Sequence, residues 1–329
     1  MQTISRRSFL LASAAATAAG AWPGIANAKP FVPANPANMI CAYPSGALGD
    51  GTARIVAKGL SEIWNIPLPV ENKTGASGMI AAAQVAKGAA DGSTLLCMIP
   101  EALSVAQALQ VPMGFDVLRD LKPIAVPVVS ACILAVNSKT AYQSYGDLIS
   151  FAKKNPGKVS FGIQGTGTAF HLAMVRWAMA EGIDVTPIPY RGGATALTDL
   201  LGGQIDAMFL ATSLGLPYFQ DGRLRALAAT SKQGIAALPD LKTLHQLGVT
   251  DYELNVNIGI LAQGSTDTRT ADALNQACEQ AMQTADARAW MQNNHVVASG
   301  LSSSALQERM AREVADFTEL AARANIRLS

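Results

Sequence analysis

Short apolar runs that end in glycine-containing loops recur along this chain, and helix-like patterns follow them. The first run, residues 39–43 (MICAY), leads into 44–50 (PSGALGD) and then into a stretch with an apolar face at helical spacing. Alternation of this kind predicts a doubly wound α/β architecture with parallel sheets, in which ligands bind beyond the carboxyl ends of strands. The other predicted strands are 68–71, 94–99, 128–136, 159–163, 185–190, 205–210 and 256–262, and two long helices are expected at 270–283 and 303–324.

The loop 44–50 has the composition of an anion site. Its small residues allow close approach of backbone N–H groups, and Asp50 stands where a helix N-cap belongs. The N-terminus of the following helix favours negative charge, so a carboxylate is the first hypothesis for its ligand. An ordinary strand-to-helix turn is the alternative for this loop taken alone.

The N-terminus predicts export. Arg6 and Arg7 precede an apolar, alanine-rich stretch at 10–21, and residues 26–28 (ANA) form a small-residue cleavage site. The stretch is shorter than the roughly 20 residues that span a membrane. We therefore expect residues 1–28 to be a cleaved twin-arginine export signal and the mature protein to lie in the periplasm.

Charge and cysteine usage exclude several classes of function. Without Arg6 and Arg7, 23 basic side chains stand against 24 acidic ones, with no basic run, so no nucleic-acid partner is expected. The cysteines lack metal-ligand spacing and are expected to be buried thiols. A disulfide between Cys41 and Cys97, which hold matching places three residues before a proline, is the alternative if their strands are neighbours. No metal or cofactor is expected.

The remaining glycine-rich loops offer hydroxyls and helix N-termini but no recognisable catalytic motif, so a binding protein is expected rather than an enzyme. Residues 165–168 begin a dinucleotide-type pattern, but Phe170 takes the place of its third glycine. His171 falls in the first turn after this loop, where it either contacts a ligand or is a structural histidine.

Five segments together carry a family resemblance. They are residues 43–50 (YPSGALGD) with Ala53 and Arg54 after them, 72–78 (NKTGASG), 91–96 (DGSTLL), 165–172 (GTGTAFHL), and 190–193 (YRGG) with 199–206 (DLLGGQID). In this order, behind an export signal, they resemble the extracytoplasmic solute receptors of tripartite tricarboxylate transporters, the Bug or TctC family.

The resemblance implies a periplasmic-binding-protein-like fold of two α/β domains with a ligand cleft between them. Domain 1 would comprise 29–130 and 253–329, and domain 2 would be the inserted segment 131–252, with crossings near 128–136 and 252–257. Such a monomer would close on a small carboxylate, an organic acid or an amino acid, and deliver it to integral membrane permease subunits. A ligand sensor for a membrane signalling protein is the alternative, and a hydrolytic enzyme is a third class.

The family's ligand-binding positions carry over residue by residue. Three positions depart from the family pattern. Ala47 replaces a loop glycine, Ser45 replaces a proline or glycine, and Val175 stands where a glutamate commonly follows the His-Leu pair. Glu101 is expected either to hold a ligand ammonium at the cleft mouth or to be a helix-start carboxylate. The predicted set is Tyr43, Ser45, Gly46, Ala47, Asp50, Thr74, Gly75, Ala76, Ser77 and Glu101 on one side, and Thr166, Gly167, Thr168, His171, Tyr190, Gly192, Gly193 and Ala194 on the other.

Overall fold

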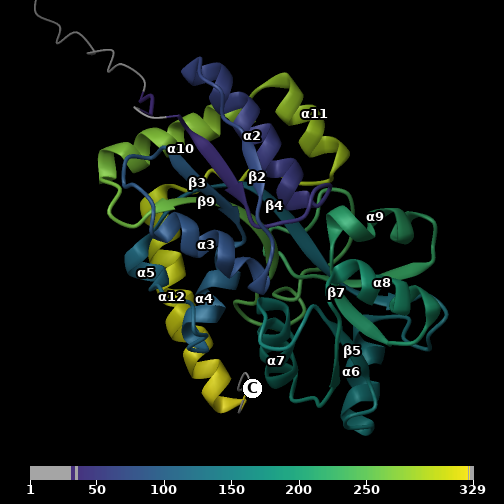
Figure 1. The fold of residues 1–329 in the computed structure, drawn as a ribbon. Coiled ribbons are helices and arrows are strands. Elements are labelled where there is room, and N and C mark those ends of the chain that lie inside the picture. Colours follow the sequence, from purple (N-terminus) through teal and green to yellow (C-terminus); the bar gives the residue numbers. More distant parts are fainter. Residues whose placement is uncertain (1–30, 34–35, 325, 327–329) are drawn as a thin grey trace, which may run out of the picture. The chain divides into compact units, whose positions relative to one another are not determined.

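A computed structural model describes residues 31–33, 36–324 and 326 of the chain (Figure 1). The predicted export signal, residues 1–28, lies outside these residues. Within the described part, no helix combines the length and the apolar character that a membrane span needs.

The described strands are β1 (Asn38–Cys41), β2 (Val70–Asn72), β3 (Thr94–Met98), β4 (Leu121–Asn137), β5 (Ser160–Ile163), β6 (Thr186–Pro189), β7 (Ala207–Ala211), β8 (Leu224–Ala229) and β9 (Asn255–Gln263). The α-helices are α2 (Leu48–Trp64), α3 (Met79–Ala86), α4 (Pro100–Ala108), α5 (Val117–Asp120), α6 (Tyr145–Lys154), α7 (Ala169–Glu181), α8 (Gly193–Gly202), α9 (Thr212–Gln220), α10 (Thr268–Met282), α11 (Ala285–Asn293) and α12 (Ser303–Arg323). A 3-10 turn, η1 (Ala76–Gly78), precedes α3.

The described strands form one nine-stranded sheet in the order β2-β1-β3-β9-β4-β7-β5-β6, with β8 also paired to β4. Strands β1, β2 and β3 are mutually parallel, as are β5, β6 and β7. The prediction of parallel sheets was wrong for the centre, because β9 pairs antiparallel with β3 and β4, and β4 pairs antiparallel with β7 and β8.

Strand β4 joins the two parts of the sheet (Figure 1). Its first part, up to Ala131, pairs with β9, and its second part, from Cys132, pairs with β7 and β8. Sequence predicted only its continuous apolar run, 128–136, because Lys122 and Pro123 interrupt the pattern on the N-terminal side. The predicted domain boundaries stay a prediction.

Helices cover both faces of the first part of the sheet. Because side chains alternate along a strand, Ile40 and Leu96 point to one face and Cys41 and Cys97 to the other. The first pair belongs to a core with side chains of α3, α4 and α12, and α12 packs along α4 (Figure 1). The opposite face carries α2, which packs on α10 so closely that a Cβ on Gly59 would lie 2.5 Å from that of Ala281.

The second part of the sheet has its own aromatic core. Phe161, Trp177, Phe209 and Tyr252 contact one another in a chain with ring centroids 5.0 to 5.9 Å apart. Side chains of α6 and α7 complete this core, and α8 packs on the other face. Both parts of the sheet therefore have the α/β layering that places loops and helix N-termini at strand ends.

Candidate functional site

The loop after β1 turns directly into the first turn of α2. Ala47 is the N-cap of α2 and provides no side-chain cap, so the prediction that Asp50 is the N-cap was wrong. Gly46 has a φ of +85°, which explains why glycine suits this position. The Ala47 N–H donates to the Pro44 carbonyl (3.3 Å), which closes the turn.

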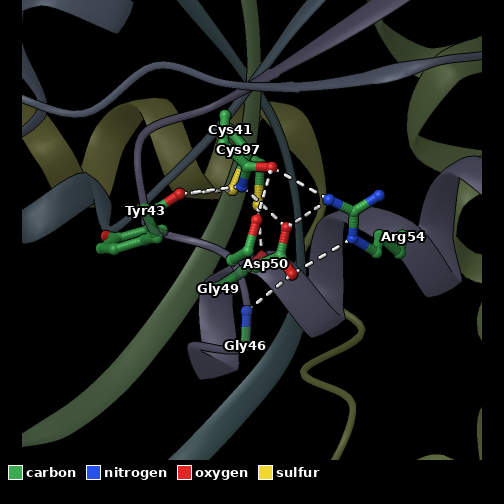
Figure 2. Close-up of polar contacts among 9 residues, drawn as sticks. Cys41, Tyr43, Gly46, Gly49, Asp50, Arg54 and Cys97 are labelled. Atoms are coloured by element: carbon green, nitrogen blue, oxygen red, sulfur yellow. Dashed lines mark hydrogen bonds and ion pairs between the residues drawn. The ribbon is translucent and has the colours of Figure 1, made fainter.

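Asp50 lies in the first turn of α2, and its side chain bonds to the loop that precedes this helix (Figure 2). Its buried carboxylate accepts hydrogen bonds from the Gly46 N–H (3.0 Å), Arg54 (3.1 Å to Nε) and Asn72 (2.7 Å). Burial opposes ionisation of Asp50, but these donors outweigh it and lower its pKa to about 2. The carboxylate is therefore neutralised by the protein itself.

Asn72 connects this loop to β2. Its Nδ2 donates to the Tyr43 carbonyl (2.8 Å) as well as to Asp50, and its Oδ1 accepts from Arg54 (2.9 Å) and Ser45 (3.3 Å). The interactions of Gly46, Asp50, Arg54 and Asn72 are called the Asp50 network below. Sequence reasoning missed Asn72 as a site residue, although it opens the family-like segment 72–78.

Tyr43 fixes the loop to the end of β3. Its hydroxyl accepts a hydrogen bond from the Ile99 N–H (2.8 Å), and burial raises the pKa of this tyrosine well above its usual range. Its ring lies on Gly49, where a Cβ would be 2.1 Å from the ring carbon Cδ2 (Figure 2). The tyrosine is therefore held on both sides, and Gly49 is required for its position.

The loop before α3 has an unusual backbone. Gly75, Ala76, Ser77 and Gly78 all have positive φ, between +45° and +122°. For Ala76 and Ser77 this conformation costs about 1–2 kcal/mol each. Gly78 is the N-cap of α3.

This strained loop lies next to the end of β1. A Cβ on Gly78 would lie 3.2 Å from that of Ala42, the residue before Tyr43. The predicted site residues Thr74 to Ser77 are exposed. The structure thus brings the loops after β1, β2 and β3 together.

Glu101 lies in the first turn of α4, shortly after the end of β3. It is buried, and its Oε1 accepts from Arg309 of α12 and from Asn257 of β9. Its Oε2 is buried and has no hydrogen-bond partner among the described residues. Burial and the nearby Glu313 carboxylate raise the pKa of Glu101 to about 7 against the opposing effect of Arg309. Its contact with a ligand ammonium stays a prediction.

In the second part of the sheet, the loop after β5 caps α7. Thr168 is the N-cap, and its Oγ1 accepts from the His171 N–H (3.3 Å). The His171 Nδ1 accepts from the Gly167 N–H (3.1 Å), so the neutral imidazole carries its proton on Nε2. Burial lowers the pKa of His171, which favours this neutral form.

The loop after β6 lies beside that loop. The Tyr190 N–H donates to the Ile163 carbonyl (2.9 Å), and a Cβ on Gly193 would lie 3.2 Å from Gln164 Nε2. Gly192 is the N-cap of α8. The Tyr190 hydroxyl donates to Asp199 (2.7 Å), a partner that the sequence did not predict. Burial of Tyr190 and, to a smaller extent, the Asp199 carboxylate raise the pKa of Tyr190 to about 12.

Thr166 is exposed in the loop after β5, and Ala194 is exposed in the first turn of α8. Thr166 and His171 also line a hollow of about 490 Å³ along α7, together with Met174, Asp184 and Ile326 among others. The loops after β5 and β6 are thus brought together as predicted. That they hold a ligand stays a prediction.

The chemistry of the two loop groups is that of neutral donors. Helix N-termini of α2, α7 and α8 supply N–H groups without intrahelical partners, while Asp50 and Asp199 are engaged inside the protein. Within the described residues no cluster of histidine, cysteine and acidic side chains has the arrangement of a metal site. The strands of Cys41 and Cys97 are neighbours as their matching places suggested, and both residues are free thiols.

Comparison with known proteins connects this chain to one family. Residues 52–323 match the TctC family model, described as the tripartite tricarboxylate transporter family receptor. Protein BugT of Bordetella pertussis is 33% identical over 252 residues, which cover 76% of this chain and 77% of BugT.

Solved structures extend the similarity to the fold. The periplasmic binding protein BugD is 28% identical with a TM-score of 0.74, and the match covers 90% of this chain and 99% of BugD. An R. palustris protein solved with adipate is 27% identical with a TM-score of 0.75, over 88% of this chain and 97% of that one. The predicted family and the periplasmic-binding-protein-like fold are confirmed.

Proposed function

This chain belongs to the tripartite tricarboxylate transporter receptor family, and on that premise we propose that it captures a small carboxylate in the periplasm and delivers it to integral membrane permease subunits. The proposed site consists of the loops after β1, β2 and β3 on one side and the loops after β5 and β6 on the other.

One observation carries the carboxylate proposal. The loop that leads into α2 is held in place by the Asp50 network, and the acidic group of that network is already paired with Arg54 and Asn72. The first turn of α2 can then present its N–H groups to an anion without repulsion from an unpaired carboxylate. The adipate bound to the R. palustris relative supports a ligand of this class.

We further propose that the two loop groups belong to two lobes that close by hinge motion. The chain would cross between the lobes in β4 at Ala131–Cys132 and again just before β9. Thr230 connects these crossings, because its Oγ1–H is shared between the Cys132 carbonyl (2.9 Å) and the Leu254 carbonyl. A hydroxyl that bonds both crossing strands would let them bend together.

Ligand binding is tested by thermal shift on the mature protein. The panel contains adipate, shorter dicarboxylates, amino acids, and neutral controls in which diamides and diols replace the carboxylates. We expect a carboxylate to raise the melting temperature, since a ligand at one hundred times its Kd stabilises a protein by about 2.7 kcal/mol. Equal shifts with the diamides or diols would contradict a carboxylate site.

The location of the site is tested with a matched pair of substitutions. Ser45 is exposed in the first loop, and Ser150 is exposed on α6. Ser45→Trp should abolish the carboxylate-dependent shift, whereas Ser150→Trp should keep it. A Ser45→Trp protein that binds as wild type would move the site away from this loop.

Delivery is tested by uptake of the labelled ligand in cells that lack the receptor. The wild-type chain should restore uptake, and Ser45→Trp should not. Ligand-dependent gene expression without any change in uptake would instead favour the sensor alternative.

A further inference from the structure

Two thiols lie beneath the loop 44–49 on the α2 side of the sheet. Cys41 ends β1, Cys97 lies in β3, and the two residues are direct partners in the parallel ladder. Neighbouring strands are about 4.8 Å apart, which is inside the Cα separation that a disulfide spans. Both side chains are fully buried, and Figure 2 shows their sulfur atoms close together.

Each thiol also contacts one end of the loop. The Cys97 Sγ donates to the carbonyl of Gly49 in the first turn of α2 (3.5 Å), and the Cys41 Sγ lies 3.9 Å from the carbonyl of Tyr43. Loop residues 44–46 are exposed. The thiol pair therefore contacts both ends of the segment that leads from β1 into α2.

The four cysteines differ in the pKa of their thiols. The hydrogen-bond contact between the two thiols lowers the pKa of Cys41 to about 7 against the effect of burial, and the same contact raises the pKa of Cys97. Burial raises the pKa of Cys278 to about 12 and also raises that of Cys132. Since the thiolate is the nucleophile, Cys41 is the reactive member and Cys278 an inert internal control.

We propose that Cys41 and Cys97 form a redox site that a hydroperoxide converts into a disulfide. The Cys41 thiolate attacks the terminal peroxide oxygen, the O–O bond breaks, and the leaving oxygen takes a proton to give water or an alcohol. The Cys97 sulfur then attacks the Cys41 sulfenic acid, the S–O bond breaks, and the departing hydroxide takes the Cys97 proton to form water. Two thiols thus lose two electrons and two protons while one peroxide is reduced.

The disulfide removes both S–H groups that face the loop. The Gly49 carbonyl loses its thiol donor, and Gly49 is also packed against the Tyr43 ring. Given the proposed carboxylate function, we expect the oxidised protein to bind its ligand more weakly than the reduced protein. Formation of the disulfide itself does not depend on any ligand.

Hydrogen peroxide at neutral pH is the probe. The folded mature protein is treated, then denatured in an alkylating reagent, and its free thiols and peptide masses are measured. We expect the four thiols to fall to two, with Cys41 and Cys97 peptides joined and about 2 Da lost. Loss of thiols spread evenly over all four cysteines, or no loss while circular dichroism stays native, would overturn the proposal.

Two variants separate the site from general oxidation. Cys278→Ser should form the same disulfide as wild type. Cys97→Ser should accumulate oxygenated Cys41 without a crosslink. A crosslink to Cys132 or Cys278 in that variant would contradict the assignment.

Two measurements on the wild type complete the test. The rate of disulfide formation should rise with pH as Cys41 ionises near its pKa of about 7, and a rate independent of pH would contradict Cys41 as the nucleophile. A carboxylate that binds the reduced protein should bind the oxidised one more weakly, and equal affinities would refute the effect on the loop.

Discussion

Replacing Asp50 by asparagine tests whether charge holds the loop before α2. Asp50→Asn keeps the size of the side chain and removes the carboxylate that Gly46, Arg54 and Asn72 share. The folded pKa of about 2, against an ordinary 3.8, gives the charge about 2 kcal/mol of stability at neutral pH. Because Arg54 is half-exposed and screened by solvent, we expect a loss of about 1–2 kcal/mol.

The assay is urea unfolding followed by circular dichroism across a pH series. A depressed folded pKa means that the contribution of Asp50 is present above its unfolded pKa near 3.8 and is lost as pH falls through about 2. The wild type should therefore lose stability toward acid more steeply than Asp50→Asn. Asp286→Asn is the matched control, because Asp286 forms an ion pair with Lys58 that is exposed to solvent, and its loss should change stability much less than Asp50→Asn does.

Ligand affinity gives a second readout of the same change. If the full loss of about 2 kcal/mol in stability fell on the loop before α2, its affinity for a carboxylate would fall up to about thirtyfold. Asp286→Asn should leave affinity unchanged. If Asp50→Asn matches Asp286→Asn in both stability and affinity, the Asp50 network does not position the loop.

Three further changes have defined outcomes. The pKa of Glu101 is raised to about 7 in the folded protein, so the protein loses stability as pH rises from the unfolded pKa near 4.5 toward 7. Urea unfolding of Glu101→Gln should not show this decline. A pH profile identical to that of the wild type would contradict the raised pKa. Gly49→Ala should destabilise the fold by about 1–3 kcal/mol, because its Cβ would meet the Tyr43 ring, and a melting temperature equal to wild type would show that the ring moves freely. Exchanging Arg6 and Arg7 for lysines should retain the precursor in the cytoplasm on cell fractionation, whereas normal export would argue against a twin-arginine route.

Local patterns in the sequence were sufficient for most elements. The helix predicted at 303–324 and the strand predicted at 256–262 agree with α12 and β9 to within one residue at each end. Hydrophobic periodicity is a local property, so these elements could be read from the chain. The parallel sheet was not predicted correctly at its centre, because strand direction in β4 and β9 depends on partners far apart in sequence.

The sequence was sufficient to predict which loops form the candidate site, but not which hydrogen bonds and ion pairs their residues make. Asp50 looked like an N-cap because it follows small residues, yet the helix begins earlier and its carboxylate faces Arg54 and Asn72 instead. Asn72 was missed since its partners lie more than 17 residues away. Glu101 was expected either to hold a ligand ammonium or to be a helix-start carboxylate. It does lie in the first turn of α4, but its partner Arg309 comes from α12 and could not be predicted from the local sequence.

The most direct test of the carboxylate proposal is a crystal structure of the mature protein with the carboxylate that gives the largest thermal shift. We predict that a carboxylate oxygen lies about 3 Å from first-turn N–H groups of α2, with the loops after β5 and β6 on its other side. A ligand bound elsewhere, for example in the hollow along α7 without contact to residues 44–49, would contradict the proposed site.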